Sequence, residues 1–139
     1  MISRGEYMNR NNTSPFRVLV VDDEPLIRFV LSMVFKKNSS VKAVASAEEA
    51  VAEVESQFYN LCFLDIVLPG MNGLDAMKII KEISPDTKVA IMTASSLDEA
   101  MKMQIDALAY EFIEKPFEFA RIKEIANRVE TSQIQQQSL

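Results

Sequence analysis

Three short runs of uninterrupted apolar residues, at 18–21, 61–64 and 89–92, leave few folds open to this chain. Such runs are typical of strands buried on both faces of a parallel sheet. Two mixed runs, at residues 41–44 and 110–113, indicate edge strands. Amphipathic segments separate the runs, so we expect an α/β fold with a doubly wound, five-stranded parallel sheet and helices on both faces. Two strand orders stay open, and both place ligands at the carboxyl ends of the strands.

Polar residues and a proline indicate where several helices begin. Pro25 suits the first turn of a helix, where its missing N–H is no loss. Ser46 and Ser96 are each followed three residues later by a glutamate, the pattern of a capping box. Asn72 can also cap a helix. We therefore predict helices that start next to these four residues.

Composition indicates one domain with short polar ends. The chain has 139 residues, of which 48% are apolar and 25% charged, as in an ordinary globular domain. We expect a flexible leader at residues 1–15, the folded domain at 16–130, and a linker, or the end of the last helix, at 131–139. No apolar run approaches the length of about 20 residues that spans a membrane. A single cysteine, Cys62, fits a reducing cytosol, so we expect a cytoplasmic protein.

Charge and the lack of histidine exclude several kinds of chemistry. The net charge of −5 argues against nucleic-acid binding within this chain. Zero histidines exclude most zinc, haem and catalytic-triad sites, because those sites depend on imidazole. Any chemistry here therefore depends on carboxylates, hydroxyls and lysine.

Residues of these three types follow four of the five expected strands. They are Asp22, Asp23 and Glu24 after the first strand, Asp65 after the third, Thr93 after the fourth, and Lys115 with Pro116 after the fifth. Because parallel strands end at one edge of a sheet, we expect these side chains to converge. Crowded carboxylates without histidine favour Mg²⁺ or Mn²⁺, and a lysine and a hydroxyl suit the oxygens of a phosphoryl group. Taken singly, the acidic residues could serve a helix N-terminus, and the lysine could be ordinary surface. Their combination in this order indicates a site.

From about residue 16 to residue 129, the chain resembles the receiver domains of bacterial two-component response regulators. The motifs are the pair Asp22-Asp23 after an apolar strand, Asp65 within residues 64–73, Thr93-Ala94, and residues 112–117, which contain Lys115-Pro116. The resemblance implies a flavodoxin-like sheet in the order 2-1-3-4-5. The spacing of the motifs is most like that of receivers attached to transcriptional activators.

The resemblance also implies a role for each site residue. Asp65 would accept a phosphoryl group from a sensor histidine kinase or a phosphotransfer protein, and Lys115 would pair with Asp65 and then with the phosphoryl group. Mg²⁺ would be held by Asp23, Asp65 and the backbone carbonyl of Val67, with Asp22 acting mainly through a metal-bound water. These roles describe a switch that catalyses only its own phosphorylation and slow dephosphorylation.

Two further residues would carry the switch in such a domain. The Thr93 hydroxyl would turn toward the phosphoryl group, and the ring of Phe112 would move into the space it leaves. Alternatively, Phe112 is simply a core aromatic residue next to an edge strand. The peptide bond between Lys115 and Pro116 would be cis. Because the Val67 side chain cannot orient an attacking water, we expect slow loss of the phosphoryl group.

Two other functions are left as alternatives. One is a degenerate receiver that only binds proteins, although all its site positions are filled. The other is a phosphohydrolase of the haloacid-dehalogenase type, which would need an Asp-x-Asp motif after the first strand and a capping domain. The sequence has neither feature at the expected place.

The expected partners follow from the resemblance. An output domain would be controlled if the chain is a fragment, and we expect neither nucleic acid nor a membrane as a partner. A weak homodimer could form through the fourth helix, fifth strand and fifth helix in chain order. The residues expected on that face are Met101, Lys102, Ile105, Glu111, Arg121 and Lys123.

Overall fold

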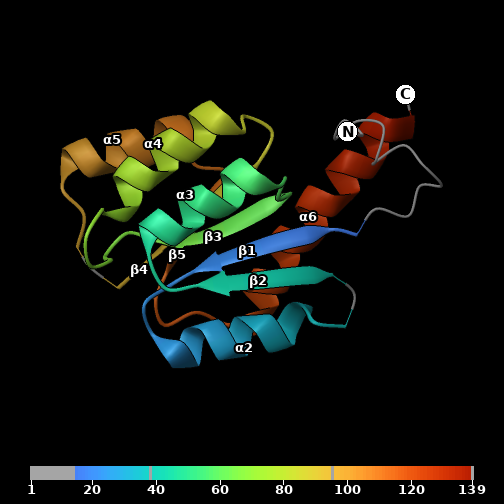
Figure 1. Ribbon diagram of the computed structural model, residues 1–139, viewed down its shortest axis with the longest axis horizontal. Coiled ribbons are helices and arrows are strands. Elements are labelled where there is room, and N and C mark those ends of the chain that lie inside the picture. The colour runs from blue at the N-terminus through green and yellow to red at the C-terminus, as the bar shows by residue number, and fades with distance from the viewer. Residues whose placement is uncertain (1–14, 38, 95, 139) are drawn as a thin grey trace.

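The structure is a computed structural model that describes residues 15–37, 39–94 and 96–138. Apart from Pro15, the expected leader therefore lies outside the described residues. Five strands form one parallel sheet in the order β2-β1-β3-β4-β5, which confirms the expected order and fold (Figure 1). The strands are β1 (Arg17–Val21), β2 (Ser40–Val44), β3 (Leu61–Asp65), β4 (Lys88–Thr93) and β5 (Glu111–Glu114).

Helices cover both faces of this sheet (Figure 1). On one face lie α3 (Ala47–Ser56), α4 (Gly73–Ile83) and α5 (Glu99–Leu108), and on the other lie α2 (Pro25–Phe35) and α6 (Phe119–Ser138). None of the helices in the described part of the chain combines the length and the apolar character needed to cross a bilayer.

Successive side chains of each strand point to opposite faces of the sheet, and this divides the core into two clusters. In β3, Cys62 and Leu64 pack against the three-helix face, whereas Leu61 and Phe63 pack against α2 and α6. The Phe63 ring stacks on Phe35 of α2, with 5.7 Å between the ring centroids. Both sides of the central strands are thus buried, which is why their sequences are continuous apolar runs. Burial raises the pKa of the Cys62 thiol to about 12, so this cysteine is a neutral part of the core.

Three of the four predicted helix starts are confirmed. Pro25 is the first residue of α2, Ser46 accepts a hydrogen bond from the Glu49 N–H, and Asn72 accepts one from the Asp75 N–H. These contacts satisfy N–H groups that the helices leave without an internal partner.

The predicted start at Ser96 is wrong. The N-cap of α5 is Asp98, whose Oδ1 accepts a hydrogen bond from the Met101 N–H at 2.8 Å. Aspartate caps a helix as well as serine does, and its negative charge also interacts favourably with the positive end of the helix dipole. At the other end of the domain, α6 continues through Ser138, so residues 131–138 belong to the last helix.

Candidate functional site

The carboxyl ends of β1, β3, β4 and β5 bring the predicted residues to one edge of the sheet. Asp22 follows β1, Asp65 and Thr93 end β3 and β4, and Lys115 follows β5. The Asp22 N–H donates to the carbonyl of Val44 in β2, which continues the strand pairing up to the site. The parallel pairing of the strands therefore determines which side chains meet.

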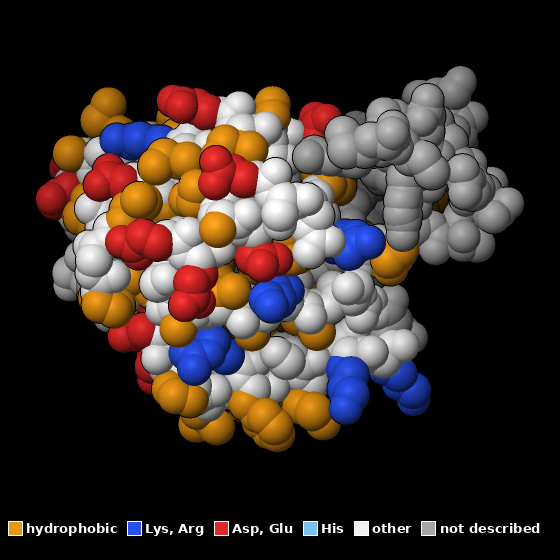
Figure 2. Space-filling model, in the orientation of Figure 1, with side chains coloured by type: hydrophobic (Ala, Val, Ile, Leu, Met, Phe, Trp, Pro, Cys, Tyr) orange, Lys and Arg blue, Asp and Glu red, His pale blue; other side chains and the backbone are white. Residues whose placement is uncertain are grey.

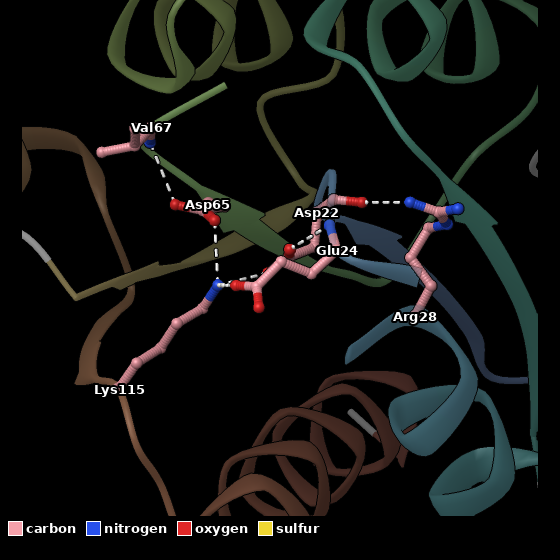
Figure 3. A network of polar contacts seen from close by, with 6 residues as sticks. All are labelled: Asp22, Glu24, Arg28, Asp65, Val67 and Lys115. Atoms are coloured by element: carbon pink, nitrogen blue, oxygen red, sulfur yellow. Dashed lines mark hydrogen bonds and ion pairs between the residues drawn. The ribbon is translucent and has the colours of Figure 1, made fainter. Parts of the chain in front are cut away.

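The ammonium group of Lys115 lies at the centre of these side chains (Figure 3). Its Nζ lies 2.6 Å from Asp22 Oδ2, 2.9 Å from Asp65 Oδ2 and 3.2 Å from Glu24 Oε1. A lysine ammonium has three N–H donors, so three carboxylates take all of them. The pairing of Lys115 with Asp65 was expected, whereas its contacts with Asp22 and Glu24 were not.

Burial differs sharply among the four partners. The side chains of Asp22, Asp65 and Lys115 are 0%, 6% and 9% exposed, whereas that of Glu24 is 60% exposed. Burial raises the pKa of Asp22, and hydrogen bonds from Lys115 and the Glu24 N–H offset only part of this effect. Burial alone would lower the pKa of Lys115, but its hydrogen bonds with Asp22 and Asp65 hold that pKa above its ordinary value. Lys115 is therefore positively charged throughout the physiological pH range.

Backbone contacts fix the two buried carboxylates. Asp22 Oδ1 accepts the Glu24 N–H at 2.9 Å, and the Asp22 carbonyl accepts from the Arg28 guanidinium at 2.9 Å (Figure 3). Asp65 Oδ1 accepts the Val67 N–H at 2.9 Å, while its Oδ2 accepts from Lys115. Each oxygen of Asp65 thus accepts a hydrogen bond, one from the Val67 N–H and one from the Lys115 ammonium, and either donor could also bind an oxygen of an anionic ligand.

The acidic residues fit a hard divalent cation. Asp22, Asp23 and Asp65 each offer a carboxylate oxygen, and these three atoms lie within 4.8 Å of one another. Oxygen ligands are what Mg²⁺ and Mn²⁺ prefer, and the exposed Asp23 opens the cluster to solvent. The Val67 carbonyl as a further ligand stays a prediction.

A glycine holds α4 close to the phosphoacceptor candidate. The N–H of Gly73, the first residue of α4, donates to the Ile66 carbonyl at 2.9 Å. A Cβ at position 73 would lie 2.6 Å from Ile66 Cα and would also collide with the Asp65 carbonyl oxygen. Only a residue without a side chain lets the helix approach this closely.

The switch candidates lie on the two strands beside the site. Thr93 is buried, and its carbonyl accepts the Lys115 N–H at 2.9 Å, which ties the end of β5 to β4. Phe112 is half-buried and packs against the three-helix cluster. The Lys115–Pro116 peptide bond is cis. The movements expected of Thr93 and Phe112 stay predictions.

The surface formed by α5, β5 and α6 differs in two ways from expectation. Ile105 is only 4% exposed and belongs to the core, so it cannot contribute to an interface. Glu111 pairs within the chain, at 2.9 Å from Arg121 and 2.8 Å from Arg128. An amphipathic helix turns one residue in three or four inward; in α5 Ile105 is buried, and the partly buried Met101 and Leu108 pack against the same core cluster.

Sequence reasoning missed two contributors to the site. In the sequence Glu24 is only one member of an acidic run, and no pattern there marks Arg28, which anchors the Asp22 carbonyl. Neither had a strong local signal, because a charged residue near a helix N-terminus is usually ordinary surface.

Comparison with known proteins places the chain in one family. Residues 18–127 match the family model described as response regulator receiver domain. The chain is 34% identical over 115 residues to the chemotaxis protein CheY of Thermotoga maritima, an alignment that covers 81% of this chain and 96% of that protein. It is 35% identical over 114 residues to the nitrogen assimilation regulatory protein NtrX of Azorhizobium caulinodans, covering 80% of this chain but only 25% of that protein.

Solved structures agree with this assignment. The response regulator protein TrrA of Thermotoga maritima, crystallised in complex with Mg²⁺ and BeF, matches with a TM-score of 0.72 and 33% identity, over 81% of this chain and 97% of that one. Receiver domains are signalling switches of two-component systems and not conventional enzymes. With the sheet order, the acidic cluster and the lysine in place, the chain belongs to the response regulator receiver domain family.

Proposed function

We propose that this domain is a phosphorylation-activated switch, in which Asp65 accepts a phosphoryl group from a sensor histidine kinase or a phosphotransfer protein. The observation that carries the proposal is the setting of the Asp65 carboxylate, held between the Val67 N–H and the Lys115 ammonium. The carboxylate is nearly buried, yet it has an oxygen within 4.8 Å of one from the exposed Asp23, and it shares Lys115 with the exposed Glu24. The Mg²⁺ and BeF in the TrrA complex support a metal-assisted site of the same kind.

Asp22, Asp23 and Asp65, with the Val67 carbonyl, are the groups that we expect to hold Mg²⁺ or Mn²⁺. When bound, the ion supplies positive charge for the oxygens of the phosphoryl group during transfer. Lys115, whose Nζ lies 2.9 Å from Asp65 Oδ2, supplies a second positive charge. Its raised pKa keeps that charge in place at neutral pH.

The transfer is a direct exchange between the Asp65 carboxylate and an activated donor, assisted by the metal ion and Lys115. A bond forms between an Asp65 carboxylate oxygen and phosphorus, while the P–N bond of the donor's phosphohistidine breaks and its electron pair stays on the imidazole. Lys115 keeps its bond to the buried Asp22 and turns another N–H to a phosphoryl oxygen. Thr93 then donates its hydroxyl to a phosphoryl oxygen, and Phe112 moves inward.

This movement would change the surface formed by α5, β5 and α6. Its exposed or half-exposed residues include Met101, Lys102, Arg121 and Lys123, which mix apolar and basic side chains. We infer that this surface controls an output domain or a weak homodimer. We also infer that the domain works in the way of receivers attached to transcriptional regulators. Light scattering before and after phosphorylation tests the dimer. If the dimer forms, the molar mass rises after phosphorylation and not before it.

An apolar surface beside the site supports docking of a protein donor. Leu26, Phe29 and Met33 are exposed along α2, and Figure 2 shows hydrophobic side chains along the edge of the molecule where α2 lies. A groove next to Lys115 is lined by Leu26, Pro116 and Phe119. A donor domain seated on this surface would bring its phosphohistidine to the nearby Asp65.

Intact-mass spectrometry after incubation with acetyl phosphate and Mg²⁺ tests the proposal. We expect one added phosphoryl group, which disappears in Asp65→Asn and when the metal is chelated. An adduct that persists in Asp65→Asn contradicts the assignment of the nucleophile. No adduct in the folded protein favours the alternative of a degenerate receiver that only binds proteins, and repeated turnover of a phosphate ester favours a phosphohydrolase.

A further inference from the structure

Glu24 is the one partner of Lys115 that the expected chemistry leaves without a task. Asp22 and Asp65 are buried and belong to the expected metal site, whereas the Glu24 side chain is 60% exposed. Its contact with Lys115, at 3.2 Å, is also the longest of the three. Glu24 therefore holds the N–H of Lys115 that is most easily released.

Helix capping does not account for the Glu24 side chain. Glu24 occupies the N-cap position of α2, yet its side chain makes no capping hydrogen bond. Its backbone N–H instead donates to Asp22 Oδ1, and its carboxylate turns to Lys115 (Figure 3). The residue thus serves the site with both its backbone and its side chain.

We propose that Glu24 is a positioning residue that holds one N–H of Lys115 until a phosphoryl oxygen displaces it, and so sets how readily the site takes up a phosphodonor. This inference rests on the proposed function of Asp65. Asp22 cannot be the residue displaced, because it is fully buried and would lose its cation in an apolar setting. Glu24 can move into water at little cost, because its side chain is already mostly exposed.

Besides competing for Lys115, Glu24 disfavours donor binding through its negative charge. One ammonium faces the three carboxylates of Asp22, Asp65 and Glu24, so the contact group as a whole is negatively charged. An incoming phosphoryl group is an anion and meets repulsion from each carboxylate. The Glu24 carboxylate therefore disfavours donor binding both by competing for Lys115 and by its charge.

The variant Glu24→Gln separates these effects from the chemistry at Asp65. The amide keeps the size of the side chain but removes the charge, and it leaves the backbone contact with Asp22. The matched control is Glu114→Gln, which removes the same charge from the exposed residue that directly precedes Lys115. Phosphorylation rates are measured against acetyl phosphate concentration, with Mg²⁺ brought to saturation separately for each protein.

We expect Glu24→Gln to lower the KM for acetyl phosphate by about threefold to fivefold, the upper part of the range for one exposed ion pair, and to leave the maximal rate within about twofold. Glu114→Gln should keep the wild-type KM. An unchanged KM in Glu24→Gln, or an equal decrease in both variants, overturns the inference while the function of Asp65 stands. If the wild-type protein is not phosphorylated at all, the proposed function and this inference fail together.

Discussion

Replacing Gly73 with alanine tests how closely α4 must approach the strand that carries Asp65. The new Cβ would lie 2.6 Å from Ile66 Cα and would overlap the Asp65 carbonyl oxygen. Carbon atoms in contact prefer separations of about 3.5–4.0 Å, so the start of α4 must move outward by roughly 1 Å. Both colliding groups are backbone, and no rotation of a side chain can relieve them.

The cost follows from two contributions. Overpacking in a tight region costs about 1–3 kcal/mol, and a shift of this size weakens the hydrogen bond from Gly73 to the Ile66 carbonyl, worth about 1 kcal/mol. We therefore expect Gly73→Ala to lower the free energy of unfolding by about 3 kcal/mol, measured by urea denaturation followed by circular dichroism. Phosphorylation of Asp65 should slow as well, because the new Cβ presses directly on the Asp65 carbonyl oxygen.

Gly70→Ala is the matched control, because its cost has a different origin. Gly70 has φ of 78°, and the three atoms nearest to a Cβ there would all belong to the flexible side chain of Glu48. The expected loss is about 1–2 kcal/mol, from the left-handed backbone conformation alone. The reasoning is refuted if Gly73→Ala unfolds within about 1 kcal/mol of wild type, or if Gly70→Ala is the more damaging change.

Three further predictions concern separate parts of the domain. Val67→Asn should shorten the lifetime of the phosphoryl group on Asp65 several-fold, followed by intact mass over time; an unchanged lifetime would count against a role for this side chain. Burial alone would raise the pKa of Glu111, but its two arginine partners hold it below the ordinary value of 4.5. The ion pairs therefore stabilise the fold above that pH. Glu111→Gln should lower the free energy of unfolding by about 0.5–1 kcal/mol at pH 7, and by progressively less as the pH falls below 4.5, measured in urea titrations across pH. A difference between variant and wild type that grows on acidification would contradict this prediction. Asp98→Ala should cost about 1 kcal/mol and Ser96→Ala nearly nothing in the same assay, and equal costs would contradict the assignment of the N-cap.

The features that could be predicted from the sequence are those with a local or periodic signal. Each central strand is one apolar run, because both of its faces are buried, and each site residue lies at the end of a strand or just after it. The parallel sheet then brings together residues as distant as Asp22 and Lys115. Ser46 and Asn72 can be identified as caps from the sequence because the N–H groups that they satisfy lie within the next turn.

The features that were missed depend on competition between neighbours or on distant contacts. Ser96 and Asp98 both suit a helix start, and the sequence pattern does not say which carries the cap. The burial of Ile105 cannot be read from the sequence, because its inward position depends on how α5 packs on the sheet. The contact of Glu24 with Lys115 joins residues 91 positions apart, and no short motif encodes which of several nearby carboxylates the lysine will reach.

Borohydride reduction of the phosphorylated protein, followed by peptide mass spectrometry, tests the central claim most directly. Borohydride reduces an acyl phosphate of aspartate to homoserine, so the modified position can be identified among the neighbouring carboxylates. We predict conversion at Asp65 alone, and only after incubation with both acetyl phosphate and Mg²⁺. Conversion at Asp22, Asp23 or Glu24, with Asp65 unchanged, would contradict the account.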